Sequence, residues 1–220
     1  MREIILDTET TGLNPLDGHR IIEIGCLEMI DKVLTGQEFH YYINPQRNVP
    51  QDAYNIHGIS SEFLVDKPLF SNIVDDFLSF INGATLVIHN AKFDIGFINH
   101  ELSLLGKMPI DLDVVIDTLA MARRTFPGAR VNLDALCKRF KIDNTMRTKH
   151  GALLDSYLLA EIYIELTGGR QRSFLLQATD GEKLLAQKEI TNYNQGNNII
   201  ILPSVEELRL HEEFMSKLKG

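Results

Sequence analysis

Short apolar runs separated by turn residues predict a meander of strands at the start of the chain. Residues 3–7, 21–29 and 39–43 are expected to be strands, with a turn around residues 31–36 joining the last two. Residues 44–57 contain two prolines and are expected to form a connecting loop.

The later part of the chain has apolar residues at helical spacing, interrupted by further short strands. Helices are expected over residues 71–81, 93–105, 118–126, 133–140 and 152–166, and strands over residues 84–88 and 114–116. The last helix is expected to be strongly amphipathic and to end at Gly168 and Gly169. A strand meander followed by alternating strands and helices predicts the α/β class, with one mixed sheet flanked by helices.

The chain changes character after about residue 170. Residues 171–198 are polar and rich in Gly, Asn and Gln, which is typical of a linker. Residues 199–220 begin with an apolar run, followed by Ser204 and Glu207 at the spacing of a helix capping box. We therefore predict a domain over residues 1–170 and a flexible extension whose end docks on a partner. The alternative is that this end packs back on the domain.

Composition restricts the class of protein. The 220 residues are 44% hydrophobic and 24% charged, which are ordinary globular values. Cys26 and Cys137 lie far apart, so neither a disulfide scaffold nor a thiolate zinc cluster is expected, and two buried thiols are the simplest interpretation. Only three consecutive apolar residues precede Asp7, and no apolar run approaches the ~20 residues of a membrane span. We expect no membrane attachment and a cytoplasmic location.

The charge is distributed unevenly. The net charge is −8, and residues 1–167 carry all of it, because residues 168–220 hold seven basic and seven acidic residues. An acidic domain is not expected to bind DNA tightly by itself, since such affinity comes from many phosphate contacts. Residues 123–149 differ, with eight basic and two acidic residues. They could meet a nucleic-acid backbone, although a solvated helix face would explain the charge alone.

Two carboxylates, Asp7 and Glu9, end the first predicted strand in the sequence LDTETTG. Residues two apart in a strand point to the same face, so each carboxylate is expected to raise the pKa of the other. A divalent cation between them would remove that cost. The tripeptide is common, and a solvated strand end is the alternative, but the small residues up to Gly12 leave room for a ligand.

Three further residues are candidates for the same site. Asp94 follows strand 84–88, and ligands of open α/β sheets gather at the carboxyl ends of strands. A carboxylate that only favours a helix N-terminus is the alternative for Asp94. His150 and Asp155 are five residues apart, about 140° around an ideal helix, so His150 must precede the helix if both serve one site. Alone, His150 would be an ordinary surface residue.

Carboxylates without a Cys/His cluster form a hard-oxygen site, which favours Mg²⁺ or Mn²⁺ over zinc. Such sites suit two-metal phosphoryl chemistry, with a histidine as the general base for the attacking water. The chain has no P-loop and no GxGxxG sequence, so nucleotide-motor and dinucleotide functions lack support.

The segments DTETTG, HNAKFDIGF and HGALLD resemble, in order, the three motifs of the DEDDh 3′→5′ exonucleases. Further blocks, including RIIEIG, IHGIS, FPGAR and LDALCKRFKIDN, are similar to the epsilon (proofreading) subunits of bacterial DNA polymerase III. The resemblance covers about residues 1–170 and implies a ribonuclease-H-like fold. It also implies hydrolysis of the 3′-terminal phosphodiester, with release of 5′-mononucleotides.

The resemblance implies a role for each of the five candidate residues. Asp7, Glu9 and Asp155 would hold the first of two divalent cations, Mg²⁺ or Mn²⁺. Asp7 would also contact the second cation, with Asp94 in support, and His150 would be the general base. The pocket for the 3′-terminal nucleotide would be lined by Thr10, Gly12, Leu13, His57, Asn90 and Phe93.

The resemblance also implies partners. DNA 3′ ends, single-stranded or frayed, would be the substrate, and residues 199–220 would dock on the polymerase (alpha) subunit of DNA polymerase III. Some relatives bind a small accessory subunit as well. Two alternatives are a stand-alone RNA-processing exonuclease, which would not need the C-terminal segment, and a non-catalytic polymerase-binding subunit, which would not need all five residues.

Overall fold

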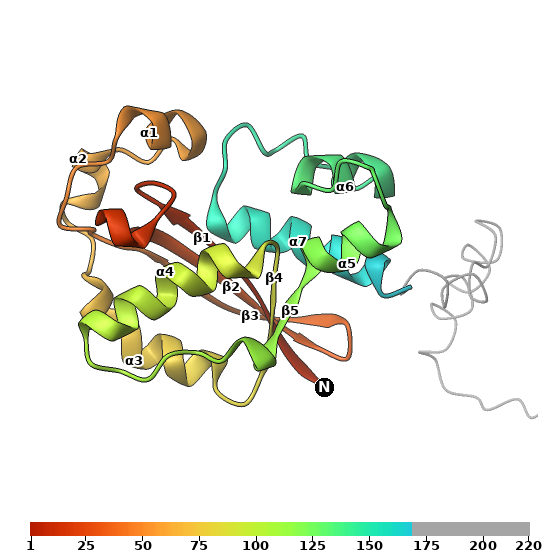
Figure 1. Cartoon of the computed structure of the whole chain (residues 1–220), viewed down its shortest axis with the longest axis horizontal. Coiled ribbons are helices and arrows are strands. Elements are labelled where there is room, and N and C mark those ends of the chain that lie inside the picture. Colours follow the sequence, from red (N-terminus) through yellow and green to blue (C-terminus); the bar gives the residue numbers. More distant parts are fainter. Residues whose placement is uncertain (169–220) are drawn as a thin grey trace, which may run out of the picture. The chain divides into compact units, whose positions relative to one another are not determined.

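A five-stranded mixed sheet forms the centre of the computed structural model, which describes residues 1–168 (Figure 1). Its strands, in the spatial order β3-β2-β1-β4-β5, are β3 (Val33–Tyr42), β2 (Ile21–Ile30), β1 (Arg2–Thr10), β4 (Thr85–Ile88) and β5 (Val115–Asp117). The first three pair antiparallel, whereas β4 and β5 run parallel to β1. The predicted mixed sheet is therefore confirmed.

Helices cover both faces of this sheet (Figure 1). They are α1 (Gln51–His57), α2 (Ser61–Leu64), α3 (Phe70–Ile81), α4 (Ala91–Leu104), α5 (Thr118–Thr125), α6 (Leu133–Phe140) and α7 (Ala152–Leu166), with short 3₁₀ turns at Pro15–Asp17 and Leu112–Val114. Ile4 and Leu6 of β1 pack with α3 and α4 on one face. Ile5 packs with Leu159 and Tyr163 of α7 on the other face. Alternate residues of β1 therefore face different helices, as strand geometry requires.

The turn between β2 and β3 is shorter than predicted. It consists of Asp31 and Lys32, whose φ angles of 50° and 68° are those of a tight two-residue hairpin. Gly36, expected in the turn, lies inside β3 with φ 84°, where residues 35–37 lie opposite Glu28 alone. The extra residues form a bulge, and a positive φ there is easiest for glycine.

The loop predicted over residues 44–57 is wrong in its second half. Helix α1 begins after Pro50 and ends at His57, where it is capped by Gly58 with a φ of 75°. Only Ala53 and His57 of α1 are buried, and two residues are too few to produce a clear helical period in the sequence. The single-turn helix α2 escaped prediction for the same reason.

Helix α7 is less amphipathic than predicted. Within it only Tyr157 and Glu161 are exposed, because the helix lies between the sheet and the α5–α6 pair. Both Cys26 and Cys137 are buried and free, as expected. Among the described residues, no helix combines the length and the apolar character needed to cross a membrane. The predicted linker and docking segment, residues 171–198 and 199–220, lie outside the described part.

Gly25 permits a close approach between β2 and the start of α7. A Cβ atom at Gly25 would lie 2.4 Å from the backbone nitrogen of Leu153, and the Ser156 hydroxyl donates a hydrogen bond of 2.9 Å to the Gly25 carbonyl. Gly25 pairs with Asp7 in the sheet. The glycine therefore brings the first turn of α7, which carries Asp155, against the sheet beside Asp7.

Replacing Gly25 by alanine should lower the free energy of unfolding by about 3 kcal/mol, because the new methyl group would meet backbone that cannot move aside. Urea unfolding would measure this. Gly96→Ala is the matched control, since a Cβ there meets nothing within 4 Å and alanine favours a helix. Equal stabilities of the two variants would contradict the proposed close approach.

Candidate active site

Asp7 and Glu9 lie near the carboxyl end of β1, on the face covered by α7. β1 extends to Thr10, further than predicted, so both carboxylates belong to regular strand. Glu9 is 8% exposed and Asp7 is partly buried. The expectation that they share one face is therefore confirmed.

Asp94 reaches the same strand from the first turn of α4. The pairing of β1 with β4 ends at Leu6, and beyond that point Asp94 Oδ1 accepts hydrogen bonds from the Thr8 backbone N–H (3.0 Å) and hydroxyl (2.7 Å). Asp94 is 2% exposed. Asp94 thus accepts the Thr8 backbone hydrogen bond that a neighbouring strand would otherwise accept, and it is held beside Asp7.

His150 lies in the loop before α7, and Asp155 lies in the first turn of that helix. Gly151 caps the helix in an extended conformation, so the chain breaks between the two residues as predicted. His150 Nδ1 is 3.7 Å from Asp155 Oδ2, and potential ligand atoms of Glu9, His150 and Asp155 all lie within 4.8 Å of one another. Glu9 and Asp155 are therefore close enough to hold one cation between them, with the His150 ring beside it.

The pKa values of three of these carboxyl groups are raised. Burial is the main cause for each. The neighbouring charges of Asp94, Glu9 and Asp155 raise the pKa of Asp7 further, and that of Glu9 reaches about 8. Burial also outweighs the hydrogen bonds from Thr8 and raises the pKa of Asp94 to about 7. The cluster therefore resists carrying its full negative charge without cations.

We predict that Asp7→Asn stabilises the metal-free protein, increasingly so as the pH rises. Burial and the neighbouring carboxylates raise the pKa of Asp7 in the folded state, so its contribution to stability falls as the pH rises from the ordinary pKa of the group towards its folded-state pKa. The melting temperature of the variant should exceed that of the wild type by roughly 5 °C at pH 8, and by less at pH 5.

The wild type and Asp7→Asn contain the same histidines, so the contribution of these residues cancels in the comparison. Histidines whose pKa is lowered by burial would make stability rise with pH, which is the opposite of the carboxylate effect. Saturating Mg²⁺ should reverse the order of the two melting temperatures. A wild type that stays the more stable at pH 8 without metal would contradict the charge repulsion.

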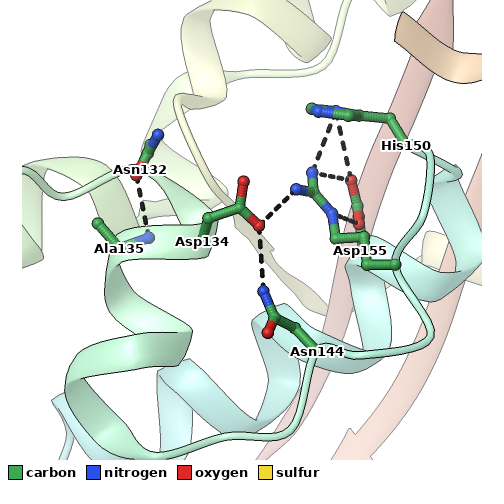
Figure 2. Close-up of polar contacts among 7 residues, drawn as sticks. Asn132, Asp134, Ala135, Asn144, His150 and Asp155 are labelled. Carbon is green, nitrogen blue, oxygen red and sulfur yellow. Dashed lines mark hydrogen bonds and ion pairs between the residues drawn. The ribbon is translucent and has the colours of Figure 1, made fainter.

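Arg147, which the sequence placed only in the basic stretch that could meet a nucleic-acid backbone, lies in the site in contact with Asp134, His150 and Asp155, all three of which are labelled in Figure 2. Its side chain is 6% exposed and forms ion pairs with Asp155 (2.5 Å) and Asp134 (2.7 Å). Burial alone would lower the pKa of the guanidinium, but the two carboxylates outweigh burial and raise it. The idea that the basic stretch meets a substrate backbone therefore does not fit Arg147 in this arrangement.

All five candidate catalytic residues line one cavity of about 930 Å³, a size typical of ligand sites. The six residues expected to line the nucleotide pocket lie there too, namely Thr10, Gly12, Leu13, His57, Asn90 and Phe93. Leu13 is 82% exposed at its rim. Asn90 has a left-handed conformation with φ 69°, which is uncommon for a residue other than glycine and frequent at functional sites.

The cavity also contains residues that the sequence reasoning passed over. His19 packs on Gly12 so closely that a Cβ there would lie 2.3 Å from its ring. His89 and Asp134 line the wall. Glu23 is not among the lining residues, but it pairs with Glu9 across β1 and β2, is 2% exposed and raises the pKa of Glu9. Glu23 could have been singled out from the sequence, because a charged residue within a mostly apolar strand needs an explanation.

Comparisons with known proteins show the family of this chain. Residues 4–163 match the model of the RNase T family, described as exonuclease. The chain belongs to this exonuclease family. It is 59% identical to the DNA polymerase III epsilon subunit of Rickettsia felis, covering 99% of this chain and 97% of the relative. Identity to the epsilon subunit of Escherichia coli K12 is 46%, covering 96% and 90%.

A solved structure of exonuclease X in complex with 5′ overhanging duplex DNA is 29% identical, with a TM-score of 0.57, covering 76% of this chain and 92% of that chain. The predicted mixed α/β fold and the predicted membership of the epsilon group of exonucleases are therefore confirmed. The chain is a nuclease subunit of DNA polymerase III that acts as a 3′→5′ proofreading exonuclease.

Proposed function

We propose that the 930 Å³ cavity is the active site in which this exonuclease hydrolyses the 3′-terminal phosphodiester of DNA. The observation that carries the proposal is the convergence of Asp7, Glu9, Asp94, His150 and Asp155 from three separate segments. Carboxylates that raise one another's pKa in a buried cavity destabilise the fold, unless cations neutralise them. Such an arrangement is expected at a functional site and has no structural benefit.

The donor set fits two divalent cations, because carboxylate oxygens are the ligands that Mg²⁺ and Mn²⁺ prefer. Asp7, Glu9 and Asp155 would hold the first cation, and Asp7 would also contact the second with Asp94 in support. When bound, the cations would lower the pKa of the attacking water and stabilise the leaving oxygen.

His150 would take the proton from the attacking water. Burial and the charge of Arg147 lower its pKa, which keeps the imidazole neutral near pH 7 and therefore able to accept a proton. The ring remains about half exposed, with 47% of the side chain accessible, so a substrate can reach it.

His57 would bind the 3′-terminal nucleotide through one nitrogen. Its Nδ1 accepts a hydrogen bond of 3.0 Å from the Ile59 N–H, so the neutral ring carries its proton on Nε2. Nε2 is buried and has no partner among residues 1–168. A buried donor without a partner is costly, and a substrate oxygen in the cavity would satisfy it.

The assembly is also proposed. Residues 1–170 would be the exonuclease domain, residues 171–198 a linker, and residues 199–220 the segment that docks on the alpha subunit. A linker would supply a high effective concentration of the exonuclease near the primer end, which an acidic domain cannot achieve through its own DNA affinity. A cytoplasmic location, where replication takes place, completes the proposal.

A primer assay tests the activity. Primers with a matched or mismatched 3′ end, and RNA of the same sequence, would be incubated with Mg²⁺, Mn²⁺ or a chelator, with and without the alpha subunit. We expect metal-dependent release of 5′-mononucleotides, faster from the mismatched DNA end because a frayed end costs less to unpair. Faster degradation of RNA than DNA, or activity in the chelator, would contradict the proposal.

A further inference from the structure

The Arg147 guanidinium donates a hydrogen bond to each of the two carboxylate oxygens of Asp155. Nε donates to Oδ1 at 2.5 Å and Nη2 donates to Oδ2 at 2.7 Å, which is the two-bond geometry of strong arginine–carboxylate pairs. Both side chains are buried, at 6% and 5% exposure. A proposed metal ligand therefore already carries a cation, and a divalent ion approaching it would meet a like charge.

The same guanidinium also forms a hydrogen bond with the His150 ring. Nη2 lies 3.0 Å from His150 Nδ1 (Figure 2). Arginine has donors only, so Nδ1 must accept this hydrogen bond, and the neutral ring must carry its proton on Nε2. In this arrangement neither ring nitrogen has a free lone pair for the proton of a water molecule. One side chain thus blocks both the ligand and the base.

The chain also provides a second position for the guanidinium. Nη1 donates to Asp134 Oδ1 at 2.7 Å, and Asp134 is itself held by Asn144 at 3.3 Å. The Asp134 side chain is 54% exposed, so water can help to solvate its ion pair with the arginine. Arg147 can therefore leave Asp155 without losing every carboxylate partner.

The loop itself is fastened independently of Arg147. The His150 backbone N–H donates to the Ile56 carbonyl at 3.3 Å, and Lys149 Nζ donates to the Asn55 carbonyl at 3.1 Å. Both acceptors belong to α1, which contributes Ile56 to the lining of the cavity. Moving the arginine side chain does not require moving the loop that positions His150.

We propose that Arg147 is a positioning residue that substitutes for the metal charge at Asp155 in the metal-free protein and, when metal binds, releases Asp155 and keeps its ion pair with Asp134. This exchange frees Asp155 and His150 together, so the base becomes available only when the metal site is filled. The inference rests on the proposed function, because it requires Asp155 to be a metal ligand. An arginine that only stabilises the fold would leave metal affinity unchanged.

Calorimetric titration of the full-length chain with Mn²⁺ tests the exchange. Arg147→Gln should bind Mn²⁺ roughly ten- to hundredfold more tightly than the wild type, the scale of one hydrogen bond between charged groups. Lys149→Gln is the matched control: it removes a positive charge two residues away that contacts α1 and not the carboxylates. Its affinity should stay within about twofold of the wild type, since exposed charges are well screened.

The unsubstituted protein provides a second measurement, which does not depend on a variant that folds. The Arg147 Nε–H should give a protected side-chain NMR signal in metal-free protein, assigned by its absence in Arg147→Gln or by triple-resonance connectivity. Saturating Mg²⁺ should shift this signal and remove its protection from exchange.

The outcomes distinguish a failure of the arginine exchange from a failure of the proposed metal site. If Mn²⁺ binds the wild type and Arg147→Gln equally, or binds the variant more weakly, the exchange is wrong and the metal site stands. A similar increase in affinity in Lys149→Gln would also overturn it, because any lost positive charge would then suffice. An Nε–H signal unchanged by bound Mg²⁺ overturns it independently. If Mn²⁺ binds none of the proteins, both the exchange and the proposed metal site fail.

Discussion

The Asp7→Asn protein should lose exonuclease activity by roughly 10³-fold or more, which corresponds to about 4 kcal/mol of transition-state stabilisation. Asp7 is the residue assigned to both cations, and it lies on β1 close enough to Asp94 and Glu9 for their charges to raise its pKa. The amide keeps the shape of the side chain while removing its charge. Single-turnover release of mononucleotides from a mismatched primer would measure the loss.

This loss must come from chemistry and not from unfolding. The same substitution is predicted to raise the metal-free melting temperature at pH 8, so it should not prevent folding, and a melting curve recorded with Mg²⁺ would show that the variant is folded at the assay temperature. An Asp7→Asn protein that cleaves primers at the wild-type rate would mean that the site is assigned wrongly.

The His150→Ala protein should lose about 10²–10⁴-fold in rate, the usual contribution of a general base. Metal binding should be largely kept, because the carboxylates that hold the cations are untouched. Stopped-flow rates across pH 6–9, together with Mn²⁺ titration, would measure both properties. The limb of the wild-type pH profile that reports deprotonation of the base should be missing in the variant.

His100→Ala is the control for this experiment. His100 lies on α4 but does not line the cavity, so its removal should leave the rate close to that of the wild type. A wild-type rate in His150→Ala would exclude His150 as the base, and an equal loss in both variants would point to a general effect of removing a histidine.

Those parts of the site that depend on local chain geometry were predictable from the sequence. The two-residue period of a strand placed Asp7 and Glu9 on one face, and the angle between positions on a helix required His150 to precede α7. The position of Asp94 followed from the rule that ligands gather at the carboxyl ends of strands. Each argument needs only a few neighbouring residues.

The parts that depend on packing between distant segments were not predictable. Arg147 belonged to a basic stretch whose simplest explanation was a solvated surface, and only the approach of α6 to α7 buries it between Asp134 and Asp155. The role of Gly25 likewise becomes clear only when α7 lies on β2. Helix α1 has too few buried residues to produce a pattern in the sequence.

Anomalous diffraction from crystals grown with Mn²⁺ and a 5′-mononucleotide tests the central claim most directly. We predict two manganese peaks in the cavity, one within coordination distance of Asp7, Glu9 and Asp155, and the other beside Asp7 on the side of Asp94. Crystals that contain the nucleotide but show no manganese among these carboxylates would contradict the account.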